Sequence, residues 1–524
     1  MVPDSSLAPA EPRADVIFAE GSSSAGSARG QLPYLIAITV IYIALAFAAG
    51  HRRIWYDELF TLDIARAPSA AKLIEFTSKW DLNPPPSYFL ARWSTDIFGA
   101  GKLGLRLPSM LEFYIASLFL FAIVRRFLGN AFAMFAVFVL WDSPYFYYAA
   151  EGRPYALLLM SFMGLLYFWE LAIRPRRSNL ALAGVLFFAV CLVISHVFAP
   201  LSLAGIYLAE MVRTVRKKKI DIALWLALLL PCAAMTIYIP LFHAYGGVVF
   251  PAAFQASPTM VWLLYHDNLW TGLTVDLLCA YAVLVIVTML RGRGDAETIY
   301  KIAPEQVAVA IYILATPLLL NVALMRGHGA FWPRYVITCG AVAYLVIAFL
   351  FAYGTRAGRK TVYAACVVLV FFAAIKASRG LSHGGPHDAS AFAAIRPGLP
   401  MVDASGEVFF EMNHYESPEF LHGLYYLKDH EAAMKYAHAS MYDTHEPPDL
   451  LPPEFEVRAH VEQYFAFVAQ HPRFLVVGRP DNPQDWLLAK LQDDGAEVEY
   501  IGNVSIPYAD SQVFLVHMPA AHPE

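Results

Sequence analysis

Apolar residues in this sequence are gathered into eleven runs, each close to the length that crosses a lipid bilayer as one helix. A transmembrane helix needs about 20 predominantly apolar residues. Of the 524 residues, 58% are hydrophobic and 15% are charged, whereas soluble proteins have about 45–50% and about 25%. We therefore predict a mostly α membrane protein with about eleven transmembrane helices, over residues 33–50, 107–124, 131–148, 155–173, 180–196, 198–212, 221–242, 271–290, 305–325, 333–353 and 361–378. The fifth and sixth runs, which meet near Ser195–Pro200, could instead form one broken element.

Basic residues are distributed unevenly between the connections. The short connections that follow odd-numbered runs contain few basic residues beyond Arg153 and Arg326. Because Lys and Arg are enriched in cytoplasmic loops, this asymmetry predicts a cytoplasmic N-terminus and an external C-terminus. The basic connections all follow even-numbered runs, at residues 125–126, 174–177, 213–219, 291–301 and 356–360.

Three parts of the chain follow from this topology. Residues 1–32 are rich in Ser, Ala, Gly and Pro and are predicted to be a disordered cytoplasmic N-terminus. Residues 33–378 form the transmembrane domain, which we expect to be catalytic and which carries a long extracytoplasmic loop over 51–106. A second external loop, near 243–270, is rich in aromatic residues.

The tail, residues 379–524, is predicted to be an extracytoplasmic α/β domain. Strand patterns at Arg473–Gly478, Glu497–Asn503 and Gln512–His517 surround a helical pattern at Asp485–Leu491. The tail carries neither a nucleotide-binding fingerprint nor a defensible cluster of metal ligands. The net charge of the whole chain is only −5, so bulk charge does not suggest a nucleic-acid partner.

Acidic residues follow the first membrane run directly, in the sequence Tyr56-Asp57-Glu58. A solvated helix start would explain them, because acidic side chains favour helix N-termini. The same loop continues with Asn83, three prolines, and an amphipathic stretch Tyr88–Phe98 that suits a helix lying in the membrane interface.

Two further external turns hold ionisable residues beside membrane helices. Glu151 and Arg153 lie between two apolar runs, where charged groups are costly and are therefore functional candidates. A solvent-exposed Glu151–Arg153 pair is the simpler alternative. Arg334 begins the tenth run; it could extend toward lipid headgroups or bind a phosphate, which a planar guanidinium suits well.

Taken in order, these motifs resemble the GT-C superfamily of integral-membrane glycosyltransferases. The similarity is greatest to the protein O-mannosyltransferase-like family 39 and its bacterial relatives, including the aminoarabinose transferases that modify lipid A. It covers about residues 33–380 and implies a GT-C fold in a bacterial inner membrane, with the C-terminal domain in the periplasm. The motifs that carry it are Tyr56-Asp57-Glu58, Asn83-Pro84-Pro85-Pro86-Ser87-Tyr88, Arg106-Leu107-Pro108-Ser109, Glu151-Gly152-Arg153-Pro154-Tyr155 and Pro333-Arg334-Tyr335.

The resemblance implies a polyprenyl-phosphate-linked sugar as donor and a lipid, glycan or protein hydroxyl as acceptor, joined by an inverting displacement. Asp57 would be the general base, with Glu58 beside it and Glu151 as a second catalytic carboxylate. Arg153 and Arg334 would bind the phosphate of the donor. Such a reaction needs a carboxylate for the incoming hydroxyl and positive charge for the outgoing oxygens.

The same motifs make Tyr56, Asn83 and Tyr88 candidate substrate-binding residues. Many relatives carry His where this chain has Asn83, and Asn cannot titrate near neutral pH. A divalent metal is possible, but no ligand set in the sequence demands one. The competing interpretations are a transporter or flippase of lipid-linked sugars, which predicts ionisable residues at the bilayer midplane, and a non-catalytic receptor or assembly factor, for which Asp57 would be dispensable.

Overall fold

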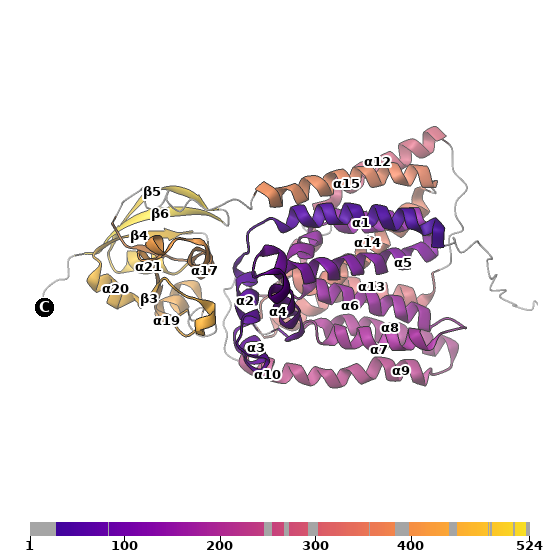
Figure 1. Cartoon of the computed structure of the whole chain (residues 1–524), viewed down its shortest axis with the longest axis horizontal. Coiled ribbons are helices and arrows are strands. Elements are labelled where there is room, and N and C mark those ends of the chain that lie inside the picture. The colour runs from indigo at the N-terminus through magenta and orange to yellow at the C-terminus, as the bar shows by residue number, and fades with distance from the viewer. Residues whose placement is uncertain are drawn as a thin grey trace, which may run out of the picture.

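A helical bundle and a smaller α/β domain stand end to end in the computed structural model (Figure 1). The outer helices α2 (Tyr56–Ala65), α3 (Ala70–Phe76) and α4 (Pro86–Phe98) cover the end of the bundle that faces the α/β domain. The structure describes residues 28–81, 83–245, 254–266, 272–291, 302–327, 329–355, 357–382, 398–439, 448–479, 482, 485–506 and 509–519.

Each of the eleven apolar runs coincides with helical structure. Among the described residues, seven helices are long and apolar enough to cross a membrane, and two shorter apolar helices accompany them. The chain is therefore a multi-pass membrane protein. The bundle is built from α1 (Ala28–Gly50), α5 (Lys102–Asp142), α6 (Tyr155–Ala172), α7 (Asn179–Val193), α8 (Ala199–Lys217), α9 (Ile222–Leu229), η3 (Leu230–Ile237), α10 (Tyr238–Tyr245), α12 (Gly272–Arg291), α13 (Pro304–Met325), η5 (Pro333–Val336), α14 (Ile337–Thr355) and α15 (Arg359–Ser382).

Two boundaries differ from the sequence-based expectation. Helix α1 begins at Ala28, so its first turn lies within the segment predicted to be disordered; residues 1–27 lie outside the described residues. Helix α5 contains two of the predicted spans. At Gly129 its backbone has φ 78° and ψ 176°, a conformation that is nearly restricted to glycine, and the chain folds back there.

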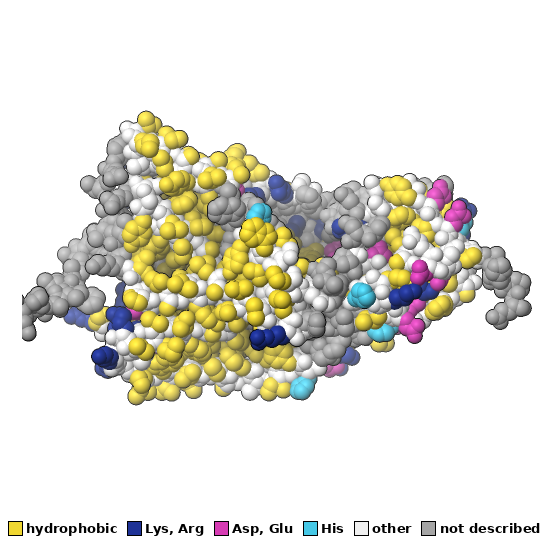
Figure 2. Space-filling model, turned by 180° about the vertical axis from the view of Figure 1, so that it is seen from behind, with side chains coloured by type: hydrophobic (Ala, Val, Ile, Leu, Met, Phe, Trp, Pro, Cys, Tyr) yellow, Lys and Arg dark blue, Asp and Glu magenta, His cyan; other side chains and the backbone are white. Residues whose placement is uncertain are grey.

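The surface of α1 shows what surrounds the bundle. Five large apolar side chains on this helix are 53–64% exposed, at positions 32, 36, 40, 43 and 47. This spacing of three and four residues places them on one face, and the opposite face packs into the bundle through Tyr42 and Leu45. Hydrophobic side chains likewise cover the bundle in the reverse view (Figure 2). Lipid is the solvent that such a face requires.

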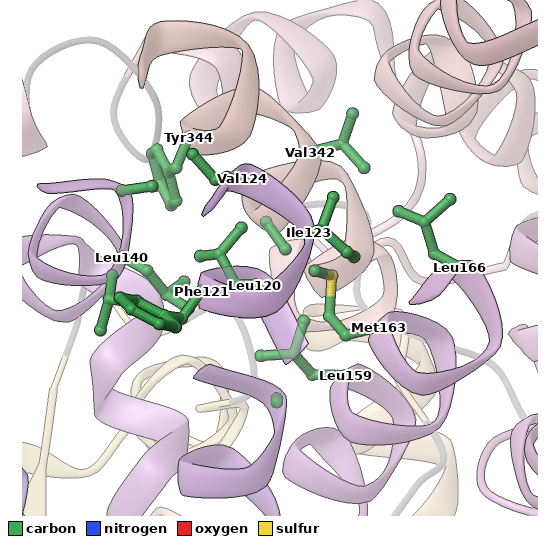
Figure 3. Close-up of a cluster of buried hydrophobic side chains, with 14 of the residues drawn as sticks. Leu120, Phe121, Ile123, Val124, Leu140, Leu159, Met163, Leu166, Val342 and Tyr344 are labelled. Atoms are coloured by element: carbon green, nitrogen blue, oxygen red, sulfur yellow. The ribbon is translucent and has the colours of Figure 1, made fainter. Parts of the chain in front are cut away.

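The core of the bundle is apolar and contains interlocking side chains of α5, α6 and α14 (Figure 3). Leu120 and Val124 come from the first half of α5, Leu159 and Met163 from α6, and Tyr344 from α14. All five are between 0% and 1% exposed. The same core holds both halves of α5 together, since Trp141 Nε1 donates to Ser117 Oγ at 2.9 Å. This packing fixes the outer ends of α5 and α6, between which Glu151 lies.

The C-terminal domain contains a six-stranded sheet in the order β3-β2-β1-β4-β6-β5. Strands β1 to β4 are parallel, and β6 pairs antiparallel with both β4 and β5. The four predicted elements of the tail are confirmed as β4, α21, β5 and β6. The domain consists of β1 (Met401–Asp403), α17 (Gly406–Tyr415), α18 (Pro418–Leu421), β2 (Leu424–Lys428), α19 (His430–Ala432), η6 (Ala433–Ala437), η8 (Pro453–Phe455), β3 (His460–Gln463), α20 (Tyr464–Gln470), β4 (Arg473–Gly478), α21 (Leu487–Asp493), β5 (Glu497–Ile506) and β6 (Ala509–His517).

One face of this sheet belongs to a hydrophobic cluster that continues into the outer helices. Alternate residues of β4 divide between the two faces, as strand geometry requires: Leu475 and Val477 join this cluster, whereas Phe474 and Val476 join another. The shared cluster includes Phe60 of α2, whose ring lies 5.5 Å from that of Phe410 on α17. The domain is thus packed against the loop that carries Asp57.

Candidate active site

Asp57 lies in the first turn of α2, directly after the first membrane helix. The unpaired N–H groups of a helix start favour an acidic side chain there. The Asp57 side chain is 14% exposed, and its Oδ2 lies 3.1 Å from Arg334 Nη2. Arg153 Nε lies 4.0 Å from the same oxygen. Asp57 is therefore a largely buried carboxylate between two guanidinium groups.

Glu58 is fully buried in an ion pair with Arg106. Arg106 Nε and Nη2 donate to the two carboxylate oxygens of Glu58 at 2.8 and 2.6 Å, and Gly152 N donates to Oε1 at 2.7 Å. Burial alone would raise the pKa of Glu58, but the Arg106 guanidinium outweighs burial and holds the pKa below its ordinary value. Glu58 connects the loop over 51–106 both to α5 and to the 151–153 turn.

A tight turn positions Glu151 between α5 and α6. Arg153 N donates to Glu151 O at 2.8 Å, which closes a three-residue turn. A Cβ atom on Gly152, at the centre of the turn, would lie 2.7 Å from Leu105 Cγ, so any larger residue would have to displace the Leu105 side chain. Glu151 is 1% exposed, and its Oε1 accepts a hydrogen bond from Trp55 Nε1 at 3.0 Å. Among the described residues, Glu151 Oε2 has no hydrogen-bond partner.

The Glu151 carboxyl can change protonation near neutral pH. Burial raises its pKa from 4.5 to about 7, although Arg52 opposes the shift; Glu58 and Asp57 add to it, and Arg334 lowers it. A pKa near the working pH is what general acid–base catalysis favours. The turn therefore supplies a second carboxyl able to take or give a proton close to Asp57.

Arg334 is brought to these carboxylates by η5. Its guanidinium carbon lies 5.6 Å from the Trp55 ring centroid, 5.7 Å from that of Tyr155 and 5.0 Å from that of Trp332. These aromatic faces stabilise the cation and restrict its position. Its Nε has no hydrogen-bond partner in the part of the chain that the structure describes. Arg334 thus retains donor capacity beyond its pairing with Asp57.

Arg153 is more fully occupied than Arg334. Its Nη2 donates to Asp81 Oδ1 at 2.8 Å, and its Nη1 donates to the other oxygen of Asp81. Nη1 also donates to Asp57 O and to Thr61 Oγ1, each at 3.1 Å. Arg153 therefore connects the loop over 51–106 to the 151–153 turn. Asp81, which precedes the triple-proline motif, was not among the predicted site residues.

The three predicted substrate-binding residues are buried. Tyr56 is 3% exposed and packs its ring 5.1 Å from that of Phe60. Asn83 is 8% exposed, and its Nδ2 donates to Asp81 Oδ1 at 3.1 Å. Tyr88 is fully buried. In this structure they support the loop, and their contacts with substrate stay predictions.

The C-terminal domain adds two carboxylates that the sequence did not reveal. Glu411 of α17 accepts a hydrogen bond at Oε1 from Tyr56 N at 3.0 Å. Glu407, one turn earlier on α17, is exposed to solvent and interacts electrostatically with Asp57 and Arg334. No signal in the sequence marks either residue, because both lie about 350 positions from Asp57.

The structure thus brings Asp57, Glu151 and Arg334 together around Trp55, with Arg153 against Asp57. Glu58 lies apart from them in its pairing with Arg106. Within the described residues, no group of three or more His, Cys, Asp or Glu side chains is arranged to hold a metal ion.

Replacing Glu151 by Gln should stabilise the protein at alkaline pH. The pKa of Glu151 is about 7 in the folded protein and 4.5 in the unfolded chain. Protonated Glu151 therefore stabilises the folded state below about pH 4.5, and this stabilisation is lost as the pH rises through 7. Relative to wild type, the variant should gain about 3 kcal/mol between pH 4.5 and pH 8.5. Thermal unfolding of detergent-solubilised protein at both pH values measures the difference.

The matched control for this measurement is Glu431→Gln, which removes an exposed carboxylate of the C-terminal domain. It should change stability by less than about 0.5 kcal/mol at either pH. An equal difference between Glu151→Gln and wild type at the two pH values would show that Glu151 does not titrate in this range.

Comparisons with known proteins agree with this architecture. The family model described as dolichyl-phosphate-mannose-protein mannosyltransferase matches residues 83–238. A comparison with curated protein sequences found no match. The fold matches the crystal structure of ArnT from Cupriavidus metallidurans bound to undecaprenyl phosphate, with a TM-score of 0.51 and 14% sequence identity over 93% of this chain and 98% of ArnT. The apo crystal structure of the same protein gives a TM-score of 0.48 at the same identity and coverage.

At 14% identity, the likeness to ArnT concerns the fold. The family match adds a sequence relationship over residues 83–238, which include Glu151 and Arg153. The resemblance inferred from the motifs is confirmed: this chain is a multi-pass membrane protein with the GT-C glycosyltransferase fold, similar to ArnT throughout and to the protein mannosyltransferase family over residues 83–238.

Proposed function

We propose that this protein is a glycosyltransferase that moves a sugar from a polyprenyl-phosphate carrier to an acceptor hydroxyl, with inversion at the anomeric carbon. The observation that carries the proposal is the meeting of Asp57, Glu151 and Arg334 at the end of the bundle beside the C-terminal domain. The family match points to transfer of a carrier-linked sugar, and a protein with the same fold was crystallised with undecaprenyl phosphate.

In the proposed reaction the acceptor hydroxyl attacks the anomeric carbon as the bond to the carrier phosphate breaks. Asp57 takes the proton from the hydroxyl, and Arg334 neutralises charge on the departing phosphate. Without ligand the two residues pair at 3.1 Å. A bound phosphate would compete with Asp57 for the Arg334 guanidinium and so free the carboxylate oxygen that this pairing occupies.

The other predicted residues then take different parts. Glu151, with a pKa of about 7, can take or give a proton near Asp57. It also positions Trp55 by accepting a hydrogen bond from the indole. Arg153 is proposed as a second phosphate contact, although reaching the donor would require it to exchange part of its pairing with Asp81. Glu58 is proposed to position Asp57 without contacting the substrate, since it is fully buried against Arg106.

We place the reaction on the periplasmic side of a bacterial inner membrane. The asymmetry of basic residues favours a cytoplasmic N-terminus, and the loop over 51–106 and the C-terminal domain pack together through the cluster of Phe60 and Phe410. Both would therefore lie on the side opposite to the N-terminus. The acceptor class, whether lipid, glycan or protein, stays open.

Deleting the gene should remove one glycosylated envelope component and lead to accumulation of its polyprenyl-phosphate sugar. Mass spectrometry of glycolipids, glycans and glycoproteins from deletion and complemented strains measures both. A flippase would instead leave transfer intact in membranes supplied with donor on the outer side. An unchanged envelope profile under conditions in which the gene is expressed would contradict the proposal.

A further inference from the structure

Helix α17 of the C-terminal domain is fixed to the loop that carries Asp57. Glu411 Oε1 accepts from Tyr56 N at 3.0 Å. Tyr415 OH accepts from Ile54 N at 2.8 Å and donates to Ile54 O at 3.2 Å. The Tyr56 and Phe410 rings lie 5.7 Å apart. Side chains of α17 thus bond backbone groups on both sides of Trp55 and hold the helix against the segment that precedes Asp57; α17 lies at the face of the domain nearest to α2 (Figure 1).

Glu407 lies on the same helix, within electrostatic range of the candidate site. It lies four residues before Glu411, and side chains at this spacing share one face of a helix. Unlike Gly406 and Val408, which are buried, Glu407 is exposed to solvent. The charged groups that interact with Glu407 are Asp57, Arg334 and Arg479. Two of them, Asp57 and Arg334, belong to the candidate site.

The surroundings of Glu407 disfavour its charged form. Although the side chain is exposed, crowding by nearby protein and the Asp57 carboxylate raise the pKa of Glu407 to about 7, against the opposing effect of Arg334 and Arg479. Because the side chain is exposed to solvent, a hydroxyl of a bound molecule can reach this carboxyl group and donate a hydrogen bond to it.

The sign of the charge limits what Glu407 can contact. A carboxylate beside Asp57 repels the phosphate of the donor, which Arg334 attracts. A neutral hydroxyl group of the acceptor is not repelled. In the proposed reaction, Asp57 takes the proton from the hydroxyl of the acceptor. The acceptor is therefore the substrate that we expect beside Glu407 and Asp57.

We propose that Glu407 is a specificity-determining residue, supplied by the C-terminal domain, that accepts a hydrogen bond from a second polar group of the acceptor next to the hydroxyl approached by Asp57. This inference rests on the proposed glycosyltransferase function. It makes the C-terminal domain one wall of the active site and assigns it a part in acceptor selection.

The test uses the full-length enzyme in detergent. Membranes of the deletion strain supply the acceptor, and a lipid extract of the same strain supplies the accumulated donor. Initial rates at varied acceptor give KM and kcat for wild type, Glu407→Gln, Glu407→Ala and the exposed control Glu431→Gln. Binding of undecaprenyl phosphate is measured separately for each, with Arg334→Ala as a variant expected to weaken it.

Glu407→Ala should raise the acceptor KM about tenfold, the effect of losing one hydrogen bond to a charged group. Glu407→Gln, which keeps one acceptor oxygen, should show a smaller increase. In both, kcat should stay within about twofold and undecaprenyl phosphate should bind as in wild type. Acceptor KM values equal to that of Glu431→Gln would overturn the inference, as would weaker binding of undecaprenyl phosphate. Absence of transfer by wild type would refute the proposed function instead.

Discussion

Asp57→Asn should reduce the rate of sugar transfer by about 10²–10⁴-fold, the usual contribution of a positioned general base. The side chain keeps nearly the same shape, so α2 and its packing should persist. The variant lacks the negative charge that pairs with Arg334 at 3.1 Å. Its amide also cannot accept the proton of the attacking hydroxyl. Initial rates with the membrane acceptor and the accumulated donor measure the loss.

A matched control lies on the same helix. Asp63 also belongs to α2, but its side chain pairs with Arg66 at 3.4 Å and does not contact Arg334. Asp63→Asn should retain most of the transfer activity. If Asp57→Asn transferred sugar at the wild-type rate, Asp57 would not be the base, and Glu151 would be the next candidate to examine.

The membrane fold could be predicted from the sequence because a bilayer imposes a length and a composition on every helix that crosses it. Each apolar run is helical for this reason. The reversal within α5 was expected from Arg125 and Arg126, which divide two apolar runs. The position of the reversal could not be predicted. It lies at Gly129 because of that residue's backbone conformation, which the sequence allows but does not require.

The candidate site could be predicted only where its residues belong to local motifs. Asp57, Glu151 and Arg334 each stand beside a membrane helix and were found in this way. The pairing of Glu58 with Arg106, 48 positions away, could not be found because it depends on how the helices pack.

The contribution of the C-terminal domain was equally invisible. Glu407 belongs to an ordinary amphipathic helix, and only the docking of α17 on segment 54–56 brings it near Asp57. The sequence indicated an α/β domain but gave no reason to associate it with the reaction. Long-range docking of this kind depends on surface complementarity, which periodicity and composition do not encode.

Arg106→Met should destabilise the protein by about 3–5 kcal/mol, the typical effect of removing one partner of a buried ion pair. All five N–H groups of a guanidinium can donate, and Arg106 makes five hydrogen bonds: two to Glu58 and three to carbonyls of segment 50–53, at 2.5–2.8 Å. The substitution leaves a charged Glu58 without its partner in a site with no access to water. Thermal unfolding in detergent measures the effect.

The Glu210–Arg213 pair separates instability from loss of the site. Arg213 Nε donates to Glu210 Oε2 at 2.8 Å, and Glu210 is also fully buried, but the pair belongs to α8. Arg213→Met should destabilise the protein while leaving transfer by the folded fraction near wild type. Arg106→Met should lose transfer even below its unfolding temperature, because this guanidinium holds segment 50–53 and Glu58, and Glu58 in turn accepts from Gly152 beside Glu151.

Combining Arg106→Met with Glu58→Gln should recover part of the stability, since the buried uncompensated charge is gone. It should not recover transfer, because an amide and a thioether cannot hold the loop over 51–106, α5 and the 151–153 turn in one arrangement. Recovery of both would mean that the ion pair contributes charge balance alone. Recovery of stability without transfer would mean that its directional hydrogen bonds set the geometry in which Asp57 meets the substrate.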